Sequence, residues 1–332
     1  MKKVLLHVED LKAYYPVHGG LLGKTAYVKA LDGVTFDVFE GEVLGIVGES
    51  GCGKSTLSKV ICRLEKSTGG KIYFDGKDIT QYSNRQMRDI HKQIQMVFQD
   101  PYASLNPRMS VRNILAEPML IHHLAKGKEE IDERVVSLLR KVGLDDYHAN
   151  RYPHEFSGGQ RQRIGIARAL AVEPKLIIAD EPVSALDVSI QSQVLNLMSD
   201  LQKEMNLTYI FIAHDLSVVE HISDRVGVMY LGSFVEMADK DSLYQHPMHP
   251  YTQALLSAVP LPNPHLRKER AALQGSIPSA LNPPSGCKFH TRCPQCMEQC
   301  KRVAPNWVEV SPGHRVCCHL YDNDSKPQNK KE

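Results

Sequence analysis

Residues 48–55 constrain this chain more than any other stretch, because they match a phosphate-binding loop at every position. The stretch Gly48–Ser55 reads GESGCGKS, which fits the pattern G-x-x-x-x-G-K-[ST]. An apolar run, Val43–Val47, precedes the loop, and a helical pattern, Thr56–Leu64, follows it. The sequence therefore predicts a strand, a glycine-rich loop and a helix that together bind a nucleoside triphosphate.

The expected role of each loop residue follows from phosphate chemistry. The glycines let successive backbone N–H groups converge on the β-phosphate, and the helix adds its positive N-terminal end. Lys54 can reach the β- and γ-phosphates and is a catalytic candidate, while the Ser55 hydroxyl can ligate Mg²⁺. The nucleotide-binding candidates here are Gly48, Ser50, Gly51, Gly53, Lys54, Ser55 and Thr56.

A second apolar strand ends in two carboxylates. Leu176–Ala179 is followed directly by Asp180 and Glu181. A buried strand exposes its last residues at the carboxyl edge of the sheet, where open α/β folds bind ligands. Asp180 can hold Mg²⁺ through water, and Glu181 can act as the general base that polarises an attacking water.

The order of apolar runs indicates the fold class. Val43–Val47, Gln95–Phe98, Leu176–Ala179 and Tyr209–Ile212 are short and apolar throughout, as in strands buried on both faces. The helical pattern Ile190–Glu204 separates two of them, as a βαβ crossover requires. Residues 106–155 read as mostly helical. We expect an α/β protein whose parallel sheet carries a helical insertion.

A further glycine-containing stretch identifies a family. In Phe156–Gln160, Ser157 can cap the helix Arg161–Ala171, and Gly158 and Gly159 free backbone N–H groups for an anion. Here the sequence resembles the ATP-binding subunits of ABC transporters, whose signature is Ser-Gly-Gly-Gln. The resemblance implies that a cradle formed by Ser157, Gly158, Gly159 and Gln160 closes on nucleotide held by the opposite subunit of an ATPase dimer.

The same resemblance implies roles for three more residues. Gln99 matches the glutamine that contacts Mg²⁺ and the transmembrane partner, and His214 matches the switch histidine on the γ-phosphate. Tyr15 is the expected adenine platform, with Tyr14 the alternative. The implied fold is an ABC-type P-loop ATPase, with a RecA-like core sheet, an antiparallel β subdomain and a helical subdomain over about residues 100–160. The ATP-binding domain is expected to span residues 1–245.

Several stretches are similar to the oligopeptide/dipeptide importer branch. They are Gly45–Lys54, Val97–Pro107, His249–Leu256 and Gly286–Pro294. Membership of that branch implies uptake of peptides. Two homologous ATPases would power two permeases, and an extracytoplasmic binding protein would deliver the peptide to them. Nickel, glutathione or another small solute is the alternative cargo. A soluble ABC ATPase acting on ribosomes or DNA is a weaker alternative, because the chain has one phosphate loop, no heptad run and no basic patch.

Charge and hydropathy bear on location and partners. The chain has 40 basic and 38 acidic residues, which gives no reason to expect nucleic acid as a partner. No stretch approaches the roughly 18 apolar residues of a membrane span, and the start lacks the apolar core of a secretory signal. The expected location is peripheral, on the cytoplasmic face of a membrane that other chains cross.

Six of the eight cysteines lie between Cys287 and Cys318, within an expected extension, residues 246–332, that has recurrent prolines and a polar tail. In a cytosolic protein such a cluster indicates metal binding. The residues alone leave zinc, an iron–sulfur cluster and reduced structural thiols open. The importer branch implies a [4Fe–4S] cluster, with Zn²⁺ the alternative, on Cys287, Cys293, Cys300 and Cys318, leaving Cys296 and Cys317 as extras.

Overall fold

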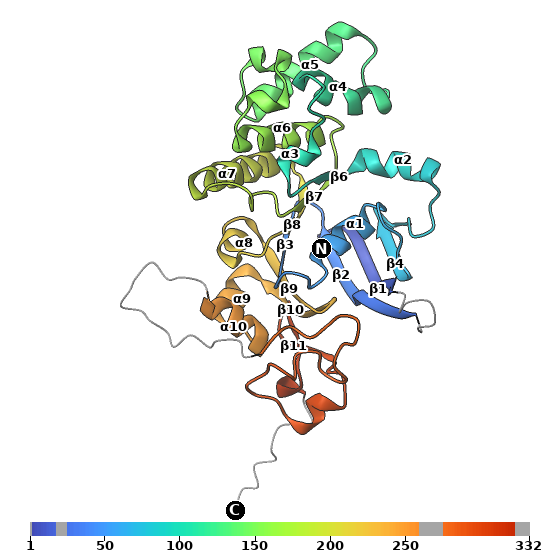
Figure 1. The fold of residues 1–332 in the computed structure, drawn as a ribbon, viewed down its shortest axis with the longest axis vertical. Coiled ribbons are helices and arrows are strands. Elements are labelled where there is room, and N and C mark those ends of the chain that lie inside the picture. The colour runs from blue at the N-terminus through green and yellow to red at the C-terminus, as the bar shows by residue number, and fades with distance from the viewer. Residues whose placement is uncertain (1, 18–24, 259–274, 323–332) are drawn as a thin grey trace, which may run out of the picture.

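A computed structural model describes residues 2–17, 25–258 and 275–322 of the chain (Figure 1). The predicted polar tail beyond residue 322 and three of the recurrent prolines of the expected extension, Pro260, Pro262 and Pro264, lie outside the described residues.

An eight-stranded sheet forms the centre of the molecule, in the order β11-β12-β10-β9-β3-β8-β7-β6 (Figure 1). The strands β9, β3, β8, β7 and β6 are parallel neighbours, and β10, β12 and β11 continue the sheet in antiparallel fashion. The bounds are β3 Val43–Val47, β6 Ile94–Val97, β7 Leu176–Asp180, β8 Thr208–Ile212, β9 Arg225–Tyr230, β10 Ser233–Asp239, β11 Trp307–Ser311 and β12 His314–Cys317. The four predicted apolar runs are thus β3, β6, β7 and β8, with β6 one residue earlier than expected.

Alternating side chains of the parallel strands enter two separate cores. In β3, Leu44 and Ile46 pack into one core, while Val43 and Val47 pack into the other on the opposite face. Every residue of β3, β7 and β8 is buried. Strands covered on both faces have no need of polar positions, which explains why these segments read as continuous apolar runs.

A four-stranded antiparallel sheet, in the order β2-β1-β4-β5, covers one face of the central sheet. Its core residues, among them Leu6, Phe36 and Phe74, share a hydrophobic cluster with Ile46 of β3. The strands are β1 Val4–Val17, β2 Ala26–Phe39, β4 Gly69–Phe74 and β5 Lys77–Asp78. This sheet is the antiparallel β subdomain that the resemblance implied.

Helices occupy the segment between β6 and β7, at the top of Figure 1. They are α3 Pro101–Ser104, α4 Val111–Ile121, α5 Lys128–Lys141, the short 3₁₀ helices η1 Asp146–Asn150 and η2 Pro153–Glu155, and α6 Gly158–Leu170. The remaining helices are α1 Lys54–Ile61, α2 Asn84–Gln93, α7 Val188–Met205, α8 Leu216–Ile222, α9 Lys240–Gln245, α10 Pro250–Ala258, η3 Glu298–Lys301 and η4 His319–Tyr321. Within the ranges that the structure describes, every helix is too short or too polar to span a membrane.

The C-terminal region continues the central sheet. Strand β12 pairs with β10, in the register Glu236 opposite Val316 and Met237 opposite Arg315. Phe289 is buried, and its ring lies 5.3 Å from the rings of both Tyr230 and Tyr251. The C-terminal region is therefore packed onto the central sheet through hydrogen bonds and aromatic contacts.

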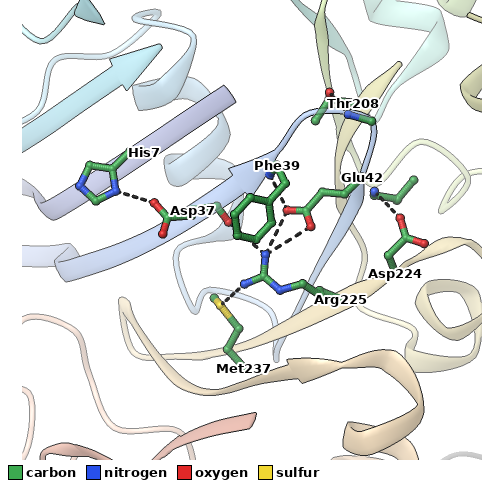
Figure 2. Close-up of polar contacts among 10 residues, drawn as sticks. His7, Asp37, Phe39, Glu42, Thr208, Asp224, Arg225 and Met237 are labelled. Carbon is green, nitrogen blue, oxygen red and sulfur yellow. Dashed lines mark hydrogen bonds and ion pairs between the residues drawn. The ribbon is translucent and has the colours of Figure 1, made fainter. Parts of the chain in front are cut away.

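An ion pair between the buried Glu42 and the partly exposed Arg225 joins the antiparallel sheet to the central sheet at the turn between β2 and β3 (Figure 2). Nη1 of Arg225 lies 3.1 and 3.3 Å from the two carboxylate oxygens of Glu42, which is fully buried. The backbone N–H of Phe39 donates to the same carboxylate at 2.8 Å, and the Arg225 guanidinium lies 5.1 Å from the Phe39 ring centroid. Burial raises the pKa of Glu42, and Arg225 opposes that shift.

Removing Arg225 should leave the buried Glu42 carboxylate without its cation. We expect Arg225→Met to lower the free energy of unfolding by about 3–5 kcal/mol, because an uncompensated buried charge is strongly destabilising. Chemical denaturation measures the loss. The double variant Glu42→Gln, Arg225→Met should recover part of it, whereas Arg85→Met, at an exposed arginine, should have little effect. Equal losses in the single and double variants would contradict this account.

Candidate functional site

The glycine-rich loop lies between β3 and α1, as predicted. Lys54 begins α1 and is only 5% exposed. Its ammonium donates to the carbonyl oxygens of Gly48 at 2.7 Å and Glu49 at 3.2 Å. The loop thus curls around the lysine, which places the cation among the backbone groups expected to receive phosphate.

Two glycines of the loop have no room for a side chain. Gly53 has φ 108°, a conformation that L-residues rarely adopt, and a Cβ there would lie 2.3 Å from the carbonyl oxygen of Ala30. A Cβ on Gly48 would lie 2.2 Å from the carbonyl oxygen of Met229. Close backbone packing therefore requires glycine at both positions.

The sheet register brings the acidic strand end beside the loop. Strand β8 lies between β3 and β7, with Ile212 paired to Ile46 on one side and to Asp180 on the other. The Ser55 hydroxyl donates to Oδ1 of Asp180 at 3.2 Å, and the Ser58 hydroxyl donates to Oδ2 at 3.1 Å. Burial raises the pKa of Asp180, and these two hydrogen bonds oppose the shift. Ser58, which was not among the residues predicted from the sequence, lies one helical turn after Ser55 on the same face of α1.

Three predicted residues meet at the carboxylate of Glu181. The side-chain amide of Gln99 donates to Oε2 of Glu181 at 3.0 Å, and Nδ1 of His214 lies 3.4 Å from the same oxygen. Glu181 itself has φ 47°, a left-handed conformation that costs a non-glycine residue about 1–3 kcal/mol. Its N–H donates to the Ile212 carbonyl at 2.9 Å, which keeps the strained residue against β8. The arrangement brings a carboxylate, an amide and an imidazole together at the carboxyl edge of the sheet.

The two tyrosines before the loop have different neighbours. Tyr14 donates from its hydroxyl to Asp32 at 2.5 Å. Tyr15 is 36% exposed, donates to Glu65 and has Thr56 of α1 within interaction distance. Tyr15 thus lies beside the helix of the phosphate loop, whereas Tyr14 is engaged on the other side of β1.

The Ser-Gly-Gly-Gln stretch forms the start of α6. The Ser157 hydroxyl accepts from the N–H of Gln160 at 3.3 Å, and the Gln160 side chain accepts from the N–H of Ser157 at 3.1 Å, which makes a capping box. A Cβ on Gly159 would lie 2.4 Å from the Ile190 side chain. Helix α6 belongs to the helical part of the chain and lies apart from α1 (Figure 1). The two candidate cradles of one chain are therefore well separated.

The C-terminal cysteines lie near one another. Burial, together with the nearby thiols of Cys287, Cys293 and Cys300, raises the pKa of the Cys318 thiol to about 12. All four predicted ligands thus share one neighbourhood. In the described part of the chain, however, no three His, Cys, Asp or Glu side chains are grouped so that they could hold a metal ion. The predicted [4Fe–4S] cluster and its zinc alternative gain no support from this arrangement.

Comparison with known proteins decides the family. Residues 31–184 match the family described as ABC transporter, and residues 235–300 match the family described as oligopeptide/dipeptide transporter, C-terminal region. The oligopeptide transport ATP-binding protein AppF of Bacillus subtilis is 57% identical over 324 residues, which cover 96% of this chain and 98% of AppF. The chain belongs to the ABC transporter family as an ATP-binding subunit.

Other relatives and solved structures agree with this family. The dipeptide transport ATP-binding protein DppF of Escherichia coli is 51% identical over 328 residues, covering 99% of this chain and 98% of DppF. The ATP-binding cassette MJ0796, in a dimeric post-hydrolysis state bound to ADP and phosphate, superposes with a TM-score of 0.64 at 29% identity and covers 71% of this chain and 99% of its own. The predicted ABC ATPase fold and the ATP-hydrolysing class are therefore confirmed.

Gly53→Ala should destabilise this ABC ATPase more than Gly51→Ala. Both glycines have positive φ, but a Cβ on Gly51 meets nothing within 4 Å, whereas one on Gly53 would meet the Ala30 carbonyl. We expect Gly51→Ala to cost about 1 kcal/mol of unfolding free energy from backbone strain alone, and Gly53→Ala to cost roughly 2–4 kcal/mol. Denaturant unfolding of both variants measures the difference. Equal losses of unfolding free energy in the two variants would show that the backbone near Ala30 can move to accommodate the added Cβ without destabilising the fold.

Proposed function

We propose that this chain powers the import of di- or oligopeptides by hydrolysing ATP as one half of an ATPase dimer. The observation that carries the proposal is the meeting of Gln99, Glu181 and His214 beside the Ser55–Asp180 pair. Peptide as cargo is supported by the names of the relatives, which are oligopeptide and dipeptide transport proteins. These relatives do not favour nickel, glutathione, ribosomes or DNA.

The proposed hydrolytic roles follow from the contacts. Lys54, now held by loop carbonyls, turns to the β- and γ-phosphates, while backbone N–H groups of the loop from Gly48 to Thr56, including Ser50 and Gly51, surround them. Glu181 orients and deprotonates the attacking water, and His214 donates to the γ-phosphate from beside Glu181. Tyr15, next to α1, stacks on adenine.

The residues present fit a magnesium ion. The Ser55 hydroxyl and the Asp180 carboxylate are already 3.2 Å apart, and Gln99 reaches the neighbouring carboxylate of Glu181. These oxygen donors are the kind that Mg²⁺ prefers. When bound, Mg²⁺ neutralises charge on the β- and γ-phosphate oxygens. Ser55, Asp180 and Gln99 are the residues that would hold it.

The separation of α6 from α1 supports a dimer. In the proposal, Ser157, Gly158, Gly159 and Gln160 of one subunit close on nucleotide held by the loop of the other. A homologous ATPase is the proposed partner, and two permeases receive the motion through the helical part near Gln99. An extracytoplasmic binding protein would deliver the peptide. The chain would lie peripherally on the cytoplasmic face of the membrane.

The domain organisation stays part of the proposal. We assign residues 1–245 to the ATP-binding domain and 246–332 to an importer-type extension. The four predicted ligands of that extension, Cys287, Cys293, Cys300 and Cys318, are neighbours without forming a metal-ligand group.

Glu181→Gln should greatly slow ATP hydrolysis while leaving ATP bound. We expect hydrolysis to fall at least about 100-fold, because general-base assistance contributes that much, while the variant still retains ATP in a closed dimer. Steady-state phosphate release and nucleotide retained after gel filtration measure the two effects. Glu129→Gln, at an exposed helical carboxylate, is the matched control. Undiminished turnover would remove Glu181 from its role as base.

Purification of the tagged protein from its native membranes in mild detergent should identify the complex to which it belongs. We expect mass spectrometry to find two multi-spanning permeases and a second ATPase, because each ATPase of this kind needs a membrane partner to move a solute. Uptake of a labelled dipeptide by cells should then stop in the Lys54→Ala variant. Recovery of ribosomal or DNA-repair proteins without permeases would contradict the importer proposal.

A further inference from the structure

The C-terminal extension contacts the phosphate loop directly, at Glu49. Arg292 donates to the Glu49 carboxylate through both terminal nitrogens, with Nη1 2.5 Å from Oε2 and Nη2 3.0 Å from Oε1. The N–H of Glu49 donates to the hydroxyl of Tyr251 at 2.8 Å. The carbonyl of Glu49 accepts from Lys54. One loop residue thus joins the extension to the lysine expected to bind phosphate.

Arg292 is held rigidly where it meets the loop. Its side chain is 4% exposed, and its N–H closes a turn onto the Phe289 carbonyl at 3.0 Å. The guanidinium lies 5.9 Å from the ring centroid of Tyr230, which packs edge-on against Phe289. A bidentate arginine–carboxylate pair fixes the relative orientation of the two groups, since both are planar, and it also places opposite charges in contact. The geometry therefore fixes the position of Glu49, the second residue of the loop, and pairs its carboxylate with a cation.

The charge of Glu49 matters because the loop receives an anion. The carboxylate belongs to the residue directly after Gly48, and a free carboxylate there would repel the phosphates of a triphosphate. Paired to Arg292 in a nearly buried contact, its field is largely cancelled. The arginine that cancels it comes from residue 292, 243 positions along the chain.

We propose that Arg292 and Tyr251 are positioning residues for the phosphate loop: together they hold Glu49 in place, and Arg292 neutralises it so that the loop accepts ATP. This inference rests on the proposed assignment of the loop to ATP. It makes the C-terminal extension a part of the nucleotide site, beyond any part it plays in assembly. Neither residue touches the phosphates in this account, because both act through Glu49.

The test compares variants of the full-length chain by calorimetric titration with Mg–ATP. Arg292→Gln leaves the Glu49 carboxylate uncompensated, so we expect the Kd for ATP to rise about tenfold or more. Glu49→Gln combined with Arg292→Gln removes both charges and should restore the Kd to within about threefold of the parent. Tyr251→Phe, which keeps the buried ring, should weaken binding about two- to fivefold.

Kinetics of the assembled transporter give a second readout. The repulsion acts on bound ATP and on the transition state alike, so Arg292→Gln should raise KM and change kcat less than about twofold. If Arg292 only stabilised the fold, Arg292→Gln would instead lower the melting temperature and the active fraction and leave KM unchanged. Arg302→Gln, at an exposed arginine of the same region, is the matched control.

Two outcomes would overturn the inference. One is unchanged ATP affinity in both Arg292→Gln and Tyr251→Phe. The other is a loss of ATP affinity in Arg292→Gln that the double variant, Glu49→Gln with Arg292→Gln, does not recover. Titration of Lys54→Ala with Mg–ATP distinguishes a failure of this inference from a failure of the proposed function. If Lys54→Ala binds ATP normally, the loop is not the ATP site; if it loses binding while Arg292→Gln retains it, only the role of Arg292 fails.

Discussion

The parallel pairing of β8 between β3 and β7 is the constraint on which the site depends. Because Ile212 pairs with Ile46 on one side and Asp180 on the other, the three strands end at the same level. Each then places a different group at one edge: the glycine-rich loop follows β3, two carboxylates lie at the end of β7 and an imidazole follows β8. A slip of one residue in either pairing would turn those strand-end side chains to the opposite face of the sheet.

The groups at that edge differ in how firmly they are held. Asp180 is 4% exposed and accepts from two serine hydroxyls of α1, so it is fixed by the same helix that carries Lys54. The His214 side chain, in contrast, is 58% exposed. The firmly held carboxylate of Asp180 and the solvent-exposed imidazole of His214 suit a site that must admit a nucleotide and then close around it. The Glu42–Arg225 pair keeps the antiparallel sheet, and with it Tyr15, in a fixed relation to that edge.

Much of this could be predicted from the sequence, because the signals were local. The loop Gly48–Ser55 needs particular residues at particular spacings, and β3, β7 and β8 are apolar because both of their faces are buried. The roles of Gln99 and His214 came from the family resemblance, and that of Glu181 from its place at the end of an apolar strand. Their meeting at one carboxylate was not predicted, since nothing in the three short segments indicates that they are neighbours. The pairing of β12 with β10 and the contact of Arg292 with Glu49 had no local signal at all. Such long-range contacts depend on the complementarity of surfaces that are far apart in the chain, and hydrophobic periodicity does not report it. The cysteine spacing, in turn, indicated a metal-ligand group that the described side chains do not form.

The distance in sequence between Glu49 and Arg292 has a consequence for the nascent chain. Residues are added at about 5–20 per second during synthesis, so the phosphate loop precedes its arginine partner by roughly 12 to 50 seconds. During that interval the β strands that carry the loop can already pair, but the Glu49 carboxylate has no cation from the extension. If Arg292 neutralises Glu49 as proposed, a ribosome-bound chain would complete its nucleotide site among the last parts of the molecule to form. Premature ATP binding by half-made subunits would be disfavoured by the order in which the residues emerge.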